Sequence, residues 1–126
     1  MAKAFSAATD MCKVPCFDRE RVEAARKIIS EEDKLLPALV DLYKLLGNAT
    51  RLKILLALRL GELCVCDMAH VLKLSMPATS HQLKLLRDRG WVRVRNDGKM
   101  IYYRLDNDRL HMALESDLAL LKSHLG

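Results

Sequence analysis

The four cysteines of the chain form two close pairs, Cys12 with Cys16 and Cys64 with Cys66. Thiolates are soft ligands, which bind ions such as Cd(II), Pb(II), Zn(II) and trivalent arsenic in preference to Mg(II) or Ca(II). Two thiols alone hold an ion weakly, so we expect both pairs to contribute to one soft-metal site. The alternative is that each cysteine is a small hydrophobic residue in the core. Two pairs together favour the metal site.

The spacing of Cys64 and Cys66 restricts where they can act together. Residues two apart on an α-helix project about 200° from one another. These thiols can therefore face one ion only on an extended segment or at the very start of a helix. Their position between Gly61 and Asp67 predicts the start of a helix, which also favours thiolates. Because Pro15 disfavours helix in its segment, residues 1–17 are expected to form a flexible metal-binding arm.

Hydrophobic periodicity predicts a mostly helical chain with one β-hairpin. Asp18, Asn48 and Ser75 are suited to cap the starts of three helices. Helices are expected at about 18–30, 30–46, 48–60, 66–72, 76–89 and 107–125, and the hairpin at 91–105, with its turn at 96–98. At 126 residues, the chain has room for one domain, which we place at 18–126 after the arm.

A short helix, a tight turn at 73–75, a second helix and a basic hairpin follow in the order of a winged helix-turn-helix. On the second helix, Thr79, Leu83 and Leu86 are expected to face the core, and the opposite face carries groups that suit base edges and phosphates. With the hairpin cations, the predicted DNA-binding residues are Ser75, Pro77, Ser80, His81, Gln82, Lys84, Arg93, Arg95, Lys99 and Arg104. The alternatives are a polar surface helix and an edge hairpin carrying protective charge.

The charge of the chain is concentrated in its centre. Residues 67–105 contain eight Lys or Arg and three Asp or Glu, an excess equal to the net charge of +5 for the whole chain. This distribution predicts double-stranded DNA as the partner, with no membrane and no small-molecule substrate. No apolar run approaches the ~20 residues of a membrane span, and no signal-peptide pattern occurs. We therefore expect a cytoplasmic protein with reduced thiols.

The last predicted helix carries a stripe of leucines that a small domain does not obviously cover. We expect a homodimer, joined through helices at about 18–46 and 107–125, that binds a two-fold symmetric operator. The alternative is that the stripe packs against helices of its own chain. The leucines concerned are Leu110, Leu114, Leu118, Leu121 and Leu125.

Four segments resemble the ArsR/SmtB family of metal-responsive repressors. They are residues 45–55 (LLGNATRLKIL), 62–67 (ELCVCD), 77–86 (PATSHQLKLL) and 98–103 (GKMIYY), and the resemblance covers 38–105 well and the flanking helices loosely. It implies a homodimer that represses a resistance or efflux operon and leaves the DNA when metal binds. Cys12 and Cys16 resemble the cadmium- and lead-sensing branch. There, the arm of one subunit is expected to complete a thiolate site with the C-x-C of the other.

That branch makes Cd(II) or Pb(II) the expected ion, with Zn(II) or As(III) as alternatives. Some family members carry a second zinc site on the C-terminal helices. The corresponding positions here are poor ligands, so we expect that site to be absent, and the alternative is a shifted site near His111, Glu115 and His124. The corresponding positions are Asn107, Arg109, Leu120 and Ser123.

Other functions of the same thiols give different predictions. An arsenite-sensing repressor, or a repressor that senses thiol oxidation or persulfides through Cys64 and Cys66, would have the same fold. A DNA-binding architectural protein with structural zinc would unfold when the metal is removed. A thiol oxidoreductase would carry C-x-x-C on a βαβ framework. The chain has neither feature, so we expect it not to be an enzyme.

Overall fold

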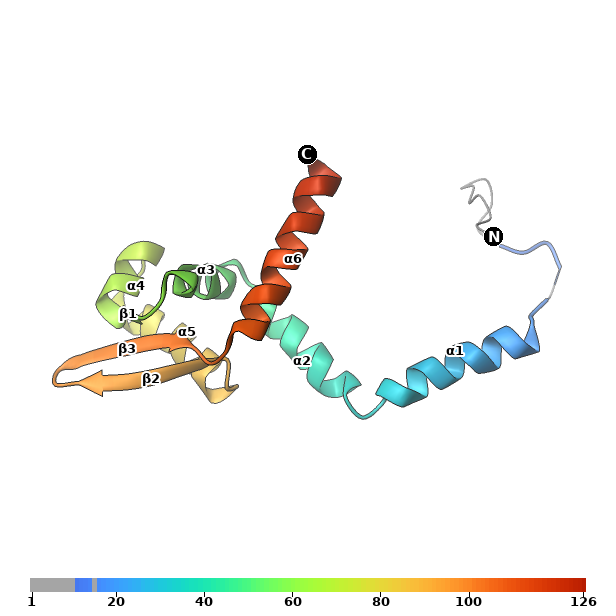
Figure 1. Cartoon of the computed structure of the whole chain (residues 1–126), viewed down its shortest axis with the longest axis horizontal. Helices are drawn as coiled ribbons and strands as arrows, with labels where there is room; N and C mark the ends of the chain where they lie inside the picture. Colours follow the sequence, from blue (N-terminus) through green and yellow to red (C-terminus); the bar gives the residue numbers. More distant parts are fainter. Residues whose placement is uncertain (1–10, 15) are drawn as a thin grey trace. The chain divides into compact units, whose positions relative to one another are not determined.

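The structure is a computed structural model that describes residues 11–14 and 16–126 (Figure 1). The chain divides into two compact units, residues 1–40 and 41–126. The predicted arm over residues 1–17 lies largely outside the described residues, and its boundary with a single domain stays a prediction. No described helix is long and apolar enough to cross a membrane.

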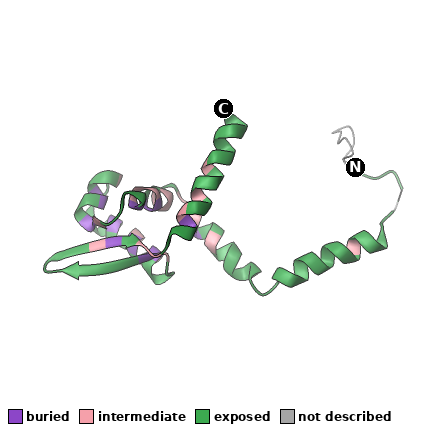
Figure 2. Cartoon of the chain, in the orientation of Figure 1, coloured by how far each residue is buried: buried purple, intermediate pink, exposed green. Residues whose placement is uncertain are grey.

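The first unit contains helix α1 (Arg19–Glu32), which begins as predicted. The carboxylate of Asp18 caps it by accepting hydrogen bonds from the backbone N–H groups of Glu20 and Arg21, at 3.1 and 3.3 Å. The second helix does not begin at Ser30 as expected, because α1 continues through this residue. Its hydroxyl donates to the carbonyl of Lys27 at 2.9 Å, a local bond that serine makes within a helix instead of capping one. Helix α1 has no buried residue (Figure 2).

Two α-helices and a short 3-10 helix precede the segment that carries Cys64 and Cys66. Helix α2 (Leu36–Leu46) precedes α3 (Ala49–Ala57), which Asn48 caps through a hydrogen bond from Arg51 N–H at 3.0 Å. A short 3-10 helix, η1 (Leu58–Leu60), follows. The chain then enters strand β1 (Leu63–Cys64) and helix α4 (Val65–Leu72). The two predicted caps at residues 18 and 48 are thus confirmed.

The winged helix-turn-helix is present in the second unit (Figure 1). Helix α4 is followed by its C-cap residue Lys73, which has the left-handed backbone conformation (φ +56°), and α5 (Met76–Asp88) begins after the cap residue Ser75. Strands β2 (Val92–Asp97) and β3 (Met100–Leu105) form the hairpin, and α6 (Asp108–Leu125) completes the chain. The predicted fold class is therefore confirmed.

The sheet has three antiparallel strands in the order β1-β3-β2. Strand β1 was not predicted, and it pairs Leu63 with Tyr103 and Cys64 with Tyr102. The hairpin turn lies later than predicted, because Asn96 and Asp97 belong to β2 and Asp97 pairs with Met100. The turn therefore consists of Gly98 and Lys99. Gly98 has φ +59°, as expected for the first central residue of a II′ hairpin turn.

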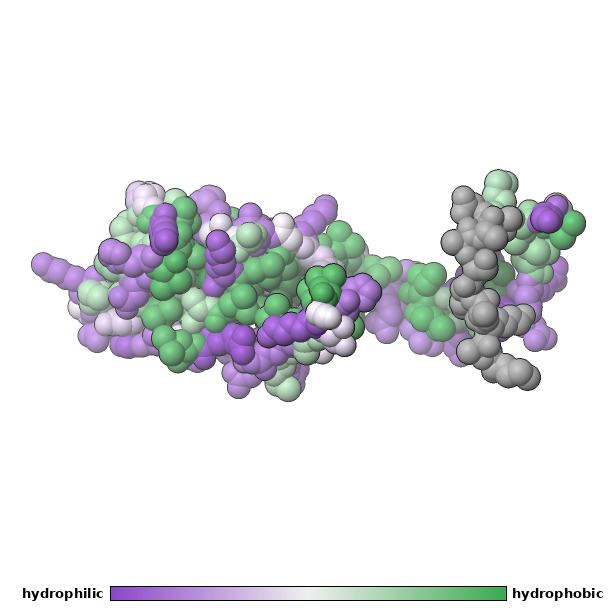
Figure 3. Space-filling model, turned by 90° about the horizontal axis from the view of Figure 1, so that it is seen from above, coloured by the Kyte–Doolittle hydropathy of each residue, from purple (hydrophilic) through white to green (hydrophobic). Residues whose placement is uncertain are grey.

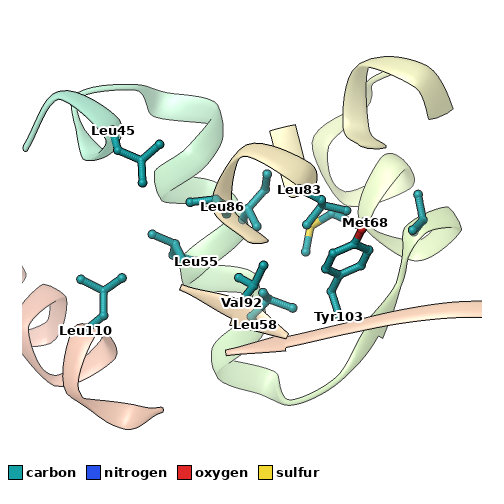
Figure 4. Packing of buried hydrophobic residues seen from close by; sticks show 11 residues of the cluster. Leu45, Leu55, Leu58, Met68, Leu83, Leu86, Val92, Tyr103 and Leu110 are labelled. Carbon is teal, nitrogen blue, oxygen red and sulfur yellow. The ribbon is translucent and has the colours of Figure 1, made fainter. Parts of the chain in front are cut away.

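The core lies in the second unit, between α3, α4, α5 and the sheet. The predicted inward face of α5 is confirmed, because Thr79, Leu83 and Leu86 are completely buried. The hydroxyl of Thr79 donates to the carbonyl of Ser75 at 2.8 Å, which satisfies this buried polar group. Figure 4 shows the labelled core side chains Leu45, Leu55, Leu58, Met68, Leu83, Leu86, Val92, Tyr103 and Leu110. This packing fixes α5 and leaves its opposite face exposed.

Ser75 stabilises the start of α5, because its hydroxyl oxygen accepts a hydrogen bond from Ala78 N–H at 3.2 Å. Ser75→Ala is expected to lower the free energy of unfolding by about 1 kcal/mol, as loss of an N-cap usually does. Urea unfolding followed by circular dichroism measures this change. Ser123→Ala, at an exposed position within α6, is the control. Equal stability of the two variants would contradict the capping role.

Candidate functional site

Cys64 and Cys66 stand at the start of a helix, as predicted. Cys64 is the last residue of β1 and the N-cap of α4, and its sulfur accepts a hydrogen bond from Asp67 N–H at 3.4 Å. Cys66 lies in the first turn of α4 and is exposed, whereas Cys64 is buried. The backbone N–H groups at a helix N-terminus stabilise negative charge, which a metal-bound thiolate carries. Both residues are free cysteines, and sulfur is the ligand type that soft metals prefer.

The two thiols share a surface pocket with the predicted DNA-binding elements. The pocket has a volume of about 120 Å³, and its walls include Met76 and Ser80 of α5. The remaining lining residues are Cys64, Val65, Cys66, Lys99, Met100 and Ile101. The C-x-C segment therefore lies directly against both the first turns of α5 and the hairpin turn. In addition, Cys64 is paired with Tyr102 of β3 in the sheet.

Cys12 and Cys16, the other predicted ligands, are both exposed in the first unit. Within residues 11–14 and 16–126, no three His, Cys, Asp or Glu side chains converge on a common metal position. The donor chemistry nevertheless fits a soft ion, because all four thiols are free and three are exposed. Their joint use as ligands stays a prediction.

The outer face of α5 carries the predicted DNA-binding side chains in two different environments. Pro77, Ser80, His81 and Lys84 are exposed. Gln82 is half-buried, and its carbonyl oxygen accepts a hydrogen bond from Arg51 Nε at 3.1 Å. The same guanidinium donates to the carbonyl of Leu45 at 3.1 Å. Gln82 therefore ties α5 to α3. Arg51 is a positioning residue that sequence reasoning missed, because the contact joins residues 31 apart.

Two of the four predicted hairpin cations are already held in ion pairs. Arg95 binds Glu62 through Nε at 3.0 Å and Nη2 at 2.5 Å, and its guanidinium lies 4.6 Å from the centre of the Tyr102 ring. Arg93 is paired with Asp106. These hydrogen bonds hold the pKa of each carboxyl, Glu62 and Asp106, below its usual value.

The other two hairpin cations, Lys99 and Arg104, differ from Arg93 and Arg95 in their ion pairing. Lys99 and Arg104 form no ion pair with any residue in the described part of the chain. Both are exposed, and Lys99 lies at the rim of the thiol pocket. The ion pair between Glu62 and Arg95 was not predicted from the sequence, because it depends on strand β1. The hairpin therefore presents fewer free cations than its sequence suggests.

The residues considered for a second metal site have other contacts. Asn107 caps α6, accepting a hydrogen bond from Arg109 N–H at 2.8 Å. Glu115 is ion-paired with Arg59, and its carboxylate oxygen also lies 3.3 Å from His111 Nε2. The carboxylate of Glu115, which a shifted metal site would need as a ligand, is thus already paired with the guanidinium of Arg59. The expected absence of this site stays a prediction.

Comparison with known proteins places the chain in a family. Residues 48–94 match the family described as bacterial regulatory protein, arsR family. The chain is 37% identical to the cadmium resistance transcriptional regulatory protein CadC homolog of Staphylococcus aureus over 107 residues, 84% of this chain and 87% of that protein. It is 49% identical to the arsenical resistance operon repressor of Escherichia coli K12 over 72 residues, 56% of this chain and 60% of that protein.

A solved structure agrees with the fold. The homodimeric winged helix-turn-helix DNA-binding domain of a possible ArsR-family transcriptional regulator from Mycobacterium bovis matches with a TM-score of 0.68 and 27% identity, covering 75% of this chain and 88% of that one. The matched family segment contains Cys64, Cys66 and all of α4 and α5. The fold and the relatives are those of DNA-binding transcriptional regulators and not of enzymes. The chain belongs to the ArsR family of bacterial regulatory proteins.

Proposed function

We propose that this protein is a homodimeric repressor that binds operator DNA through α5 and the β2–β3 hairpin and loses operator affinity on binding Cd(II) or Pb(II). Cys64 and Cys66 of one subunit, with Cys12 and Cys16 of the partner's arm, are the proposed ligands. The observation that carries the proposal is the thiol pocket, whose walls belong to both DNA-binding elements. A ligand at Cys64 and Cys66 therefore has direct access to the surfaces that contact DNA.

The described residues support the DNA-binding half of this function. Ser80, His81 and Lys84 are exposed on the face of α5 opposite the core. Such side chains form hydrogen bonds with base edges and phosphates in the major groove. Lys99 and Arg104 extend the same positive surface along the hairpin, where they would neutralise phosphates. The proposal thus assigns base contacts to α5 and mainly phosphate contacts to the hairpin.

The sheet supports a route from the thiols to the hairpin. When bound, Cd(II) or Pb(II) would supply positive charge that holds several thiolates close together. Cys64 is paired with Tyr102 in β3, so a displacement of its backbone is passed to the hairpin through the ladder. Cys66 and Met76 line the same pocket, which brings the start of α5 within reach of the same displacement. The two DNA-binding elements would then lose their relative positions.

An apolar groove supports the homodimer. It lies in the second unit between α2, α3 and α6, has a volume of about 290 Å³ and is lined by Tyr43, Leu46, Gly47, Leu52, Leu56, Leu114, Asp117, Leu118 and Leu121. Half of the Leu121 side chain is exposed, and Figure 3 shows further hydrophobic side chains at the surface of this unit. A second copy is the proposed occupant, because one monomer presents a single recognition helix to a two-fold operator.

The proposal is tested by fluorescence anisotropy on DNA from the protein's own promoter region. Cd(II) is expected to weaken binding of the reduced protein about 100-fold, which corresponds to about 2.7 kcal/mol of coupling and is typical of allosteric proteins. Thiolate charge-transfer absorbance in the ultraviolet shows independently that Cd(II) has bound. Cd(II) that binds without changing the affinity for DNA would refute the switch.

Two related functions give different results in the same assay. A repressor that responds to trivalent arsenic is favoured by the similarity to the arsenical resistance repressor of Escherichia coli. It would be released by arsenite and not by Cd(II). A thiol-redox or persulfide sensor would be released by oxidant in the presence of a chelator, and the effect would be reversed by a thiol reductant.

The ion pair between Glu62 and Arg95 gives a further prediction about DNA binding. Glu62→Gln removes the carboxylate that holds Arg95, so this guanidinium becomes available to a phosphate. Metal-free operator affinity is expected to rise. The plot of log Kobs against log salt concentration should become steeper by about 0.9 for each additional phosphate that the protein neutralises. Anisotropy titrations at several salt concentrations measure this slope.

Glu115→Gln is the matched control for this experiment. It also breaks an arginine–carboxylate pair, with Arg59, but at a position on α6 and not on the hairpin. Its salt dependence is expected to equal that of the unmodified protein. A Glu62→Gln slope equal to the control would mean that Arg95 does not reach the DNA.

A further inference from the structure

The thiol pocket contains more sulfur than the two cysteines supply. Met76, the first residue of α5, and Met100, the first residue of β3, line the same pocket as Cys64 and Cys66. Both methionines are partly exposed, at 44% and 41%, unlike the core residue Met68. Thiolates together with thioethers form a donor set that selects soft ions, Cu(I) in particular. Four residues with sulfur in their side chains therefore line one small pocket within the second unit.

The charge around this pocket favours an ion of single charge. Two thiolates and the ammonium group of Lys99 leave about one net negative charge, and the N-terminus of α4 adds partial positive charge. Thioethers are neutral and do not change this balance. A divalent ion in the pocket alone would leave excess positive charge, which two further thiolates from Cys12 and Cys16 would offset. The pocket by itself matches a monovalent cation.

We propose that Cys64, Cys66, Met76 and Met100 form a binding site for Cu(I) that does not require Cys12 or Cys16. This inference rests on the proposed use of Cys64 and Cys66 as metal ligands and extends it to a second class of ion. In this proposal, Cys12 and Cys16 complete the site for Cd(II) and Pb(II), whereas Met76 and Met100 complete the site for Cu(I). The position of Met76 on α5 and of Met100 on β3 means that the Cu(I) site would connect α4 to both DNA-binding elements within one subunit.

Anaerobic titration of the full, reduced chain with Cu(I), in competition with bicinchoninate, measures the affinity. Met76→Leu and Met100→Leu are each expected to weaken Cu(I) binding by about tenfold or more, because leucine keeps the volume and apolar character but has no sulfur. Met112→Leu, an exposed methionine of α6, is the matched control and should bind Cu(I) normally. The affinity for Cd(II), measured by thiolate charge-transfer absorbance, should be the same in all three variants.

A direct measurement distinguishes ligation from an indirect effect. In protein labelled with ¹³C at the methionine methyl groups, Cu(I) is expected to shift the resonances of Met76 and Met100 and not that of Met112. Cys12→Ser/Cys16→Ser should keep its Cu(I) affinity and lose its Cd(II) affinity. The site is refuted if the leucine variants match the control, if the two resonances do not move, or if the arm cysteines are needed for Cu(I).

These outcomes also separate the inference from the proposed function. Failure of Cd(II) to release the operator would refute the cadmium switch and leave the methionine result unaffected. If Met76→Leu and Met100→Leu bind Cu(I) as tightly as the control while Cd(II) still releases the operator, only the copper site is refuted. Cys64→Ser/Cys66→Ser is expected to lose both ions, and full retention of either would remove the cysteines from that site.

Discussion

Leu121→Lys is expected to convert the protein into a folded monomer and to reduce operator affinity by about a thousandfold or more, toward the level of non-specific binding. Leu121 lines the apolar groove of the second unit, and half of its side chain is exposed in the monomer. A lysine there is solvated in the free chain but would bury an unpaired charge in the dimer. The monomer would present one recognition helix and would lose the second half-site.

Sedimentation velocity gives the oligomeric state of this variant, and anisotropy gives its operator affinity. Met112→Lys is the control, because Met112 is also an exposed hydrophobic residue of α6 but does not line the groove. It should remain dimeric. Far-ultraviolet circular dichroism should be unchanged in both variants. A Leu121→Lys protein that remains dimeric and binds its operator would show that the dimer uses another surface.

Cys66→Ser is expected to bind the operator normally without metal and to lose the response to Cd(II), so that the change in affinity falls from about 100-fold to less than about threefold. Cys66 is exposed in the first turn of α4, and serine is close to it in size, so the fold should be retained. The effect arises because a hydroxyl is a poor ligand for a soft ion. Anisotropy with and without Cd(II) measures it.

Thiolate charge-transfer absorbance provides the parallel measurement for each cysteine. Its intensity should fall in Cys66→Ser, and it should also fall in Cys12→Ser and Cys16→Ser if the arm supplies ligands. The DNA response and the absorbance should decrease together across these variants. A Cys66→Ser protein that releases DNA in Cd(II) as fully as the unmodified chain would exclude Cys66 from the switch.

The helices and the core face of α5 could be predicted because their causes are local. Asp18, Asn48 and Ser75 accept hydrogen bonds from backbone N–H groups two or three residues away. The burial of Leu83 and Leu86 follows from helical periodicity. The start of α4 could be predicted on the assumption that Cys64 and Cys66 bind one ion, since two residues at this spacing cannot do so inside a helix.

The features that sequence reasoning missed all depend on contacts between distant segments. Strand β1 has two residues, too few to show an alternating pattern, and it exists because Leu63 and Cys64 pair with β3. Without β1, nothing in the sequence connects Glu62 to Arg95, which is 33 residues away. The thiol pocket likewise combines residues of α4, α5 and the hairpin turn.

The N-cap of α4 is a sulfur atom, that of Cys64, and this is an unusual choice for a helix cap. Oxygen-bearing side chains are the residues that favour an N-cap, and serine would accept the same hydrogen bond from Asp67 N–H. Helix capping alone would therefore favour an oxygen-bearing residue at position 64, whereas this chain has a cysteine there. The proposed metal site would account for the sulfur, because a thiol combines the capping bond with affinity for a soft ion. One buried atom would then both cap α4 and bind the ion.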